Sequence, residues 1–265
     1  MFYLTLPSNS SLGYFPENNA SHYFTKLLQT QDLNGDYEVG LAEIQFSNNY
    51  FNVDEETCYF NYESKGSPID VIEPTVAEDN QNAFTKKINV DTGLYDTNKF
   101  FIHILNKLSD SLGHMSNGKR RLKFYYNVAS KRASVTIYEP FGLLTLSTEL
   151  SSILGLPPIM LGNASFGGQS LMDLNKNFKS VFVYSDLVHP RPVGDSMVPL
   201  LRSLPPINKA DDIIHHTFEK PHYIPLARFQ FDTIEILLTT DKGKEISFIN
   251  GHTIVTLHFR QRRLI

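Results

Sequence analysis

The sequence predicts a mainly β protein: a single jelly-roll antiparallel β-sandwich with a helix–hairpin–helix (α+β) segment inserted near its midpoint. Three observations predict this fold class. Alternating apolar and polar residues mark strands in the first quarter and the last third of the chain. Between these two blocks the apolar period becomes helical. The 265 residues include 19 Phe and 13 Tyr, residue types that favour pleated surfaces.

The first block contains four candidate strands that end at turn residues. They are 2–6, 22–28, 37–46 and 57–62. Within 37–46 the apolar residues change face between Leu41 and Ile44, which indicates a β-bulge or burial on both faces. Residues 64–92 are polar and are expected to form a loop with one extended piece.

The middle of the chain supplies the predicted insertion. Apolar residues from Phe100 to Leu112 form one helical stripe, with Thr97 as N-cap and Gly113 just beyond the C-terminus. The expected elements, in chain order, are a helix over 97–113, a hairpin over 121–138, a helix over 147–154 and a loop over 160–176.

The last third returns to strands. The candidates are 179–187, 196–204, 216–218, 231–240, 244–249 and 253–260. Both faces of 179–187 are largely apolar, as in a buried strand. The turns Asp241-Lys242-Gly243 and Asn250-Gly251 join the last three segments, which predicts an antiparallel meander.

Eight strands without βαβ alternation fit two antiparallel sheets, and the jelly roll is the common eight-stranded arrangement. The predicted sandwich takes residues 1–75 and 177–265, and the predicted insertion takes 76–176. Two separate domains are the alternative. Neither strand block alone has enough strands to cover its own apolar face, so the two blocks are expected to pair with each other.

Composition excludes several classes of protein. A net charge of −4 argues against a globally basic nucleic-acid-binding face. No apolar run reaches the ~18 residues of a membrane-spanning helix, so no membrane span is expected. The N-terminus lacks the features of a signal peptide, so intracellular synthesis without secretion is expected, and the sequons at Asn9, Asn19 and Asn163 are expected to be unused.

The single cysteine excludes an intrachain disulfide and a thiolate metal cluster. Cys58 lies in an apolar candidate strand. It is therefore expected to be a small core residue and not a nucleophile.

Two segments match ligand-binding patterns only in part. Gly113–Lys119 has the spacing GxxxxGK, but Arg120 stands where a phosphate loop needs Ser or Thr, and a helix precedes the segment instead of following it. The second segment holds the possible metal ligands His215, His216, Glu219 and His222. On an extended chain the first two histidines point to opposite faces, so solvated or hydrogen-bonded imidazoles are expected.

The other candidates also lack partners. His252 and His258 lie roughly 20 Å apart on one strand, too far for a shared ion. Ser165 lies in NASFG, a near match to the GxSxG of serine hydrolases, but no strand precedes it. The remaining candidates are two polar pairs, Asp195-Ser196 and Asp211-Asp212. No catalytic, cofactor-binding or metal-binding residue is predicted, and no cofactor.

Two short basic runs are candidate contact sites for partners. The run Lys119-Arg120-Arg121 in the insertion is expected to be exposed, and Arg260-Gln261-Arg262-Arg263 at the end of the chain predicts at most a weak contact with nucleic acid. The abundance of Phe and Tyr is typical of protein interfaces.

Five stretches of the chain resemble one family. They are FYLTLPSNSS, GDYEVGLAEIQF, VGDSMVPLLRSLP, FEKPHYIPL and FDTIEILLTTDKGKEISFINGHTIVTLHFR, in that order. Over nearly its whole length the chain resembles the minor capsid, or penton, proteins of Polinton/Maverick transposable elements and related adintoviruses. The resemblance implies a structural protein of the virion with a single jelly roll and no catalytic residues.

The same resemblance implies the partners. A penton protein forms a homopentamer at each fivefold vertex of an icosahedral capsid and contacts the double jelly-roll major capsid protein. A weak contact with packaged DNA is expected from the basic C-terminal run and not from the resemblance. A vertex protein needs ring-closing contacts between copies, and the inserted segment 94–158 is expected to project and to supply much of the outward or inter-subunit surface.

Two other functions remain open from the residues alone. A jelly-roll binding module for glycans or host attachment is one, although the lack of Trp argues against sugar stacking. A jelly-roll enzyme of the cupin type is the other. It needs two clustered His and Glu motifs on facing strands, which the sequence does not supply.

Overall fold

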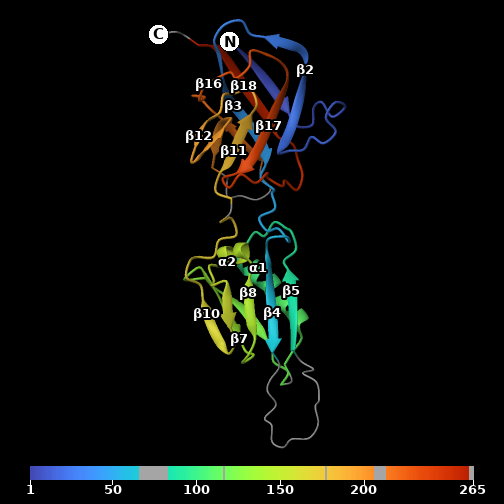
Figure 1. Cartoon of the computed structure of the whole chain (residues 1–265), viewed down its shortest axis with the longest axis vertical. Coiled ribbons are helices and arrows are strands. Elements are labelled where there is room, and N and C mark those ends of the chain that lie inside the picture. The colour runs from blue at the N-terminus through green and yellow to red at the C-terminus, as the bar shows by residue number, and fades with distance from the viewer. Residues whose placement is uncertain (66–82, 116, 177, 206–212, 263–265) are drawn as a thin grey trace, which may run out of the picture. The chain divides into compact units, whose positions relative to one another are not determined.

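The computed structural model describes residues 1–65, 83–115, 117–176, 178–205 and 213–262. The chain forms two compact units, Met1–Phe51 with Asn177–Ile265 and Asn52–Lys176 (Figure 1). Each unit has its own hydrophobic core. Among the helices of the described residues, none has the length and hydropathy needed to cross a membrane.

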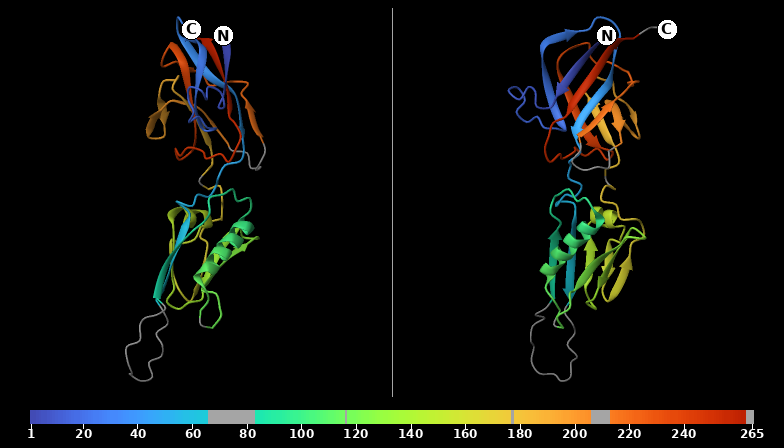
Figure 2. Two further views of the ribbon diagram at one scale, coloured as in Figure 1. Left: turned by 90° about the vertical axis from the view of Figure 1, so that its right-hand side faces the viewer. Right: turned by 180° about the vertical axis from the view of Figure 1, so that it is seen from behind.

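The first unit is a sandwich of antiparallel strands (Figure 2). The strands are β1 (Phe2–Pro7), β2 (His22–Asp32), β3 (Tyr37–Ser47), β11 (Val181–Ser185), β14 (Leu200–Leu204), β15 (Ile213–Thr217), β16 (Ile224–Pro225), β17 (Gln230–Thr240) and β18 (Ile254–Gln261). One sheet has the order β1-β18-β3-β15, with β16 also paired to β3, and the other has the order β14-β11-β17-β2. A separate hairpin joins β12 (Arg191–Val193) and β13 (Ser196–Val198).

The strand orders are those of a jelly roll. Counted in chain order without the short β12, β13 and β16, the eight sandwich strands run 1-8-3-6 in one sheet and 5-4-7-2 in the other. Strands before the insertion therefore pair with strands after it, β1 and β3 with β18, and β2 with β17. The predicted pairing of the two strand blocks is confirmed, and so is the fold class.

Strand β3 contains the predicted change of face. Thr256 pairs with Glu43 and Leu257 pairs with Leu41, so Ala42 is the extra residue of a bulge. The bulge lets both Leu41 and Ile44 enter the core, where both are buried.

The predicted C-terminal meander is wrong. β17 and β18 belong to different sheets, and residues 244–249 make only isolated bridges, Glu245 with Thr239 and Phe248 with Tyr50. Ile246 is buried in the sandwich core, which anchors this crossing segment. The turn residues predict local hairpins, but the core needs strands on both of its sides, so the chain changes sheet here.

The second unit combines two small antiparallel sheets with two helices. Its elements are β4 (Tyr59–Lys65), β5 (Ala83–Asn89), α1 (Asn98–Ser109), the 3-10 turn η1 (Asp110–Leu112), β6 (Leu122–Asn127), β7 (Arg132–Ile137), β8 (Leu143–Leu146), α2 (Thr148–Leu154), β9 (Ile159–Leu161) and β10 (Ala164–Gly167). The sheets have the orders β5-β4-β8-β9 and β10-β7-β6.

The predicted helices and hairpin are present in this unit. The Thr97 hydroxyl accepts a hydrogen bond from the Phe100 N–H, and the Ser147 hydroxyl accepts one from the Leu150 N–H, so both helices have side-chain N-caps. Gly155 ends α2 with φ +68°, a left-handed conformation that favours glycine. The expected loop over 160–176 contains β10 and the end of β9.

The first domain boundary differs from the predicted one. Residues 52–75 were expected in the sandwich, but the second unit begins at Asn52 and includes β4. Phe60 and Tyr62 of β4 are buried in the core of the second unit, and β4 pairs with β5 and β8. Local alternation predicts the strand, whereas its sheet depends on partners far along the chain. The second unit ends at Lys176, beside the other predicted boundary.

Candidate assembly surface

The structure does not gather the possible ligand residues of the sequence into a site. Gly113–Lys119 links η1 to β6, so a helix precedes this loop and a strand follows. His215 is exposed, while the His216 ring stacks on Phe218. Within the part of the chain that the structure describes, no group of three or more His, Cys, Asp or Glu side chains has the geometry for a metal ion.

Ser165 and Ser196, which are not predicted to be nucleophiles, each contact another polar side chain. Ser165 lies in β10, where its hydroxyl is 2.8 Å from that of Thr136. The Ser196 hydroxyl donates to Asp195, beside the turn of the β12–β13 hairpin. Asp211-Asp212 falls outside the described residues. Cys58 is buried, and burial raises the pKa of its thiol to about 12, as expected for an unreactive core cysteine.

The expected exposure of Lys119-Arg120-Arg121 is wrong for Arg121. Its Nη1 lies 2.8 Å from Glu139 Oε2, and the two side chains are only 14% and 9% exposed. Arg120 forms an ion pair with Asp110 at 3.1 Å. Both arginines therefore hold the second unit together through acidic partners that sequence alone does not reveal.

Arg260, the first arginine of the C-terminal run, is also engaged. Its Nε lies 2.6 Å from Glu38 Oε1, and its guanidinium lies over the Tyr223 ring at 3.4 Å. Arg262 is exposed and its backbone N–H donates to the Asp36 carbonyl, and Arg263 lies outside the described residues. The guanidinium of Arg260 is therefore already paired, so this arginine does not contribute a free charge to a basic patch.

A surface suited to protein contact lies on the outer side of the sheet β14-β11-β17-β2. Alternate residues of its strands, such as Tyr23, Val183 and Ile236, are fully buried between the two sheets, so their neighbours point outward. We call these neighbours the outer sheet face: His22, Phe24, Phe182, Tyr184, Glu235 and Leu237. All six are partly exposed.

The outer sheet face is continuous across three strands. Tyr184 of β11 pairs with Leu237 of β17, which pairs with His22 of β2. Phe24 also packs beside Phe15 of the β1–β2 loop, with ring centroids 5.3 Å apart. The sequence pattern of 179–187 predicts burial on both sides, but Phe182 and Tyr184 remain partly exposed. The apolar second side of β11 was visible in the sequence, but it predicted a buried strand and not an outer contact surface.

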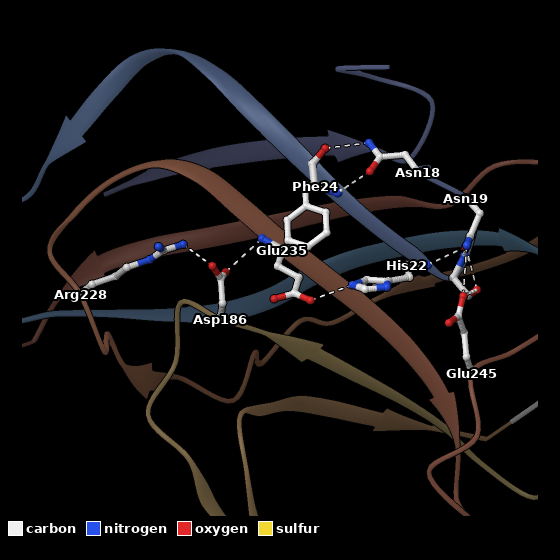
Figure 3. Close-up of polar contacts among 9 residues, drawn as sticks. Asn18, Asn19, His22, Phe24, Asp186, Arg228, Glu235 and Glu245 are labelled. Atoms are coloured by element: carbon white, nitrogen blue, oxygen red, sulfur yellow. Dashed lines mark hydrogen bonds and ion pairs between the residues drawn. The ribbon is translucent and has the colours of Figure 1, made fainter. Parts of the chain in front are cut away.

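The ionisable groups on and beside this face already have partners within the protein. His22 Nε2 lies 2.7 Å from Glu235 Oε1. The Glu235 N–H donates to Asp186 Oδ1 at 3.0 Å, and Asp186 Oδ2 pairs with Arg228 (Figure 3). Burial raises the pKa of Asp186, although the Glu235 N–H and the Arg228 charge act against that rise.

The free edge of this sheet is covered by the chain itself. β2 is the edge strand, and the Asn18 side chain bonds both backbone groups of Phe24, donating to its carbonyl at 2.8 Å and accepting from its N–H at 2.9 Å (Figure 3). The Ser11 hydroxyl accepts from the Lys26 N–H in the same way. This cover blocks uncontrolled strand pairing along the edge.

The outer sheet face carries aromatic side chains, and its ionisable groups have their partners within the same chain. Such a face is suited to contact with another protein. Aromatic residues are enriched in interface cores, and covering this face would leave none of these charges without its partner.

The comparisons with known proteins point to one fold. No family model matches the chain, and no curated protein matches it. The crystal structure of the selenomethionine-labelled mavirus penton protein is similar, with a TM-score of 0.53 and 13% sequence identity over 97% of this chain and 98% of that chain. At this identity the likeness shows the fold, a β-rich jelly roll with an inserted unit that carries the two helices.

Proposed function

We propose that this chain is a structural minor capsid protein that forms homopentameric pentons at the fivefold vertices of an icosahedral, virus-like capsid. The observation that carries the proposal is the end-to-end similarity to a viral penton protein, which spans both the sandwich and the inserted unit. The sequence resemblance to penton proteins of Polinton/Maverick elements and adintoviruses agrees with it. In this proposal the chain is not an enzyme.

A closed ring requires heterologous contacts, in which one patch of each copy meets a different patch of the next copy. We assign the outer sheet face as one of these two patches and a second copy of this chain as its occupant. Three features support this assignment. The face lies on the rigid sandwich, it is rich in aromatic groups, and its charges are paired within the protomer. The double jelly-roll major capsid protein is the proposed neighbour around the ring, which gives the chain a location in the virion.

The test is the oligomeric state of the full chain. Size-exclusion chromatography with light scattering should give five times the 30.2 kDa mass of one chain, and negative-stain microscopy should show fivefold rings. Co-expression with the major capsid protein should place these rings at capsid vertices. A chain that stays monomeric, alone and with the major capsid protein, would contradict the proposal, as would a ring of another symmetry.

A further inference from the structure

Two loops of the sandwich enclose a pocket that the proposed capsid role does not use. The loop between β1 and β2 and the crossing segment between β17 and β18 line a cavity of about 590 Å³. This volume lies within the usual range for small-molecule sites, which is about 300–1,000 Å³. About half of the lining residues are neutral and polar, among them Asn9, Asn19, Ser21, Ser247 and Asn250, and the rest of the lining is largely apolar.

One wall of the pocket is held in place by hydrogen bonds within the protein. The Asn19 side-chain oxygen accepts from the N–H groups of Ser21 and His22, each at 2.8 Å, and the Asn19 amide donates to Glu245 Oε1 at 3.1 Å (Figure 3). Ser21 Oγ lies 2.8 Å from the same Glu245 oxygen. These bonds fix the Glu245 carboxylate, so its second oxygen, Oε2, can accept from a ligand without reorganisation.

The opposite part of the lining is held in a similar way. The Asn49 amide donates to the Asn250 side-chain oxygen, which leaves the Asn250 amide as a donor. Asn9 lines the same pocket, is exposed, and makes no side-chain hydrogen bond with the described residues. The pocket therefore presents a fixed carboxylate acceptor, an amide donor and an amide that does both.

The chemistry of this lining decides between classes of ligand. Lys244 and Glu245 carry opposite charges that balance, His252 is the one other titratable side chain of the lining, and no acidic group besides Glu245 is present for a cation. Amides and hydroxyls both donate and accept hydrogen bonds, as the hydroxyls of a sugar do. Leu12 and the partly exposed Phe248 ring add apolar surface for the C–H groups of a sugar. We propose that this pocket binds a saccharide, an uncharged ligand with several hydroxyl groups.

The test is saturation-transfer NMR on the full chain, with the methyl glycosides of glucose, galactose and N-acetylglucosamine as probes. At least one glycoside should receive saturation from the protein. Asn9→Ala and Glu245→Gln should each weaken its binding about tenfold, as expected for the loss of one good hydrogen bond. The matched control is Glu17→Gln, the same chemical change on the same loop but outside the pocket, and it should bind as the unaltered chain does.

Three results would overturn the proposal. They are no transfer to any of the three glycosides, undiminished binding in both pocket variants, and binding of free arginine or inorganic phosphate in place of the glycosides. The thermal unfolding midpoint of each variant shows whether it is folded. Asn9→Ala keeps the test decisive if Glu245→Gln is unstable, because the Asn9 side chain makes no hydrogen bond to any residue that the structure describes. Saturation transfer is measured on monomers and on rings alike, so the result does not depend on assembly.

Discussion

Arg121 and Glu139 form an ion pair inside the second unit, where their side chains are only 14% and 9% exposed. The Glu139 carboxylate also accepts hydrogen bonds from the hydroxyls of Tyr62 and Ser64. Burial alone would raise the pKa of Glu139, but the bonds from Ser64, Arg121 and Tyr62 outweigh it and hold the pKa below its usual value. Three segments of the unit thus meet at one charged carboxylate.

The Glu139 carboxylate should make the free energy of unfolding depend on pH in the acid range. A Glu whose pKa is lowered by folding stabilises the folded state above its unfolded pKa of about 4.3, and the contribution is lost as pH falls through the folded pKa. Urea unfolding followed by circular dichroism should therefore show Glu139→Gln to be clearly less stable than the unaltered chain at pH 7. The difference should shrink below about pH 4. A difference that stays constant from pH 7 to pH 3 would contradict the assigned role of the charge.

Removing the cation alone should be costly. Arg121→Met leaves the buried Glu139 charge without its partner and should lower the free energy of unfolding by about 3–5 kcal/mol. The control is Arg120→Met, whose ion pair with Asp110 is about two-fifths exposed and should contribute no more than about 1 kcal/mol. The double variant Arg121→Met/Glu139→Met should recover part of the loss, because it removes the buried charge as well. If Arg121→Met and Arg120→Met lowered the free energy of unfolding by the same amount, the buried position of the Arg121–Glu139 pair would not affect its contribution to stability.

Gly162 should tolerate no side chain. A Cβ at this position would lie 2.0 Å from the Glu139 carbonyl oxygen, so Gly162→Ala must displace backbone. The expected cost is about 1–3 kcal/mol, as for other overpacked sites. Gly167→Ala is the matched control in the same unit, since nothing lies within 4 Å of its Cβ position. The thermal unfolding midpoints of the two variants check this difference in stability. An unchanged midpoint for Gly162→Ala would contradict the close approach of residue 162 to the Glu139 carbonyl oxygen.

The outer sheet face should control assembly without controlling folding. Tyr184→Glu places a charge without a partner in the proposed contact and should convert pentamers into monomers while the circular dichroism spectrum stays the same. Tyr3→Glu makes the same change on the outer side of the other sheet, where Tyr3 is exposed, and should leave the pentamer intact. Light scattering gives both masses. Pentamers that persist in Tyr184→Glu would remove this face from the ring contact.

Cys58 should be inert in the folded chain. The pKa of its thiol is raised to about 12 by burial, so almost no thiolate is present at pH 8 and reagents cannot reach the sulfur. Iodoacetamide should leave the native chain unmodified and should modify it fully in urea, as measured by mass spectrometry. Rapid modification without denaturant would show that the segment just before β4, which contains Cys58, opens readily.

Several local elements were predictable from the sequence. The helix that begins after Thr97, the β6–β7 hairpin and the bulge in β3 each depend on residues within one element or its neighbours, such as a cap, a turn or a change of period.

The sequence by itself determined the two helices, the β6–β7 hairpin and most of the long sandwich strands, and that strands from the two ends of the chain must share one core. The tertiary structure alone decided which unit β4 joins, that residues 244–249 cross between the sheets, and that Arg121 lies buried against Glu139. The physical reason is the distance along the chain over which each kind of signal acts. Periodicity, caps and turns act over a few neighbouring residues, whereas the sheet of a strand and the partner of a charge depend on segments that meet only when the chain is folded.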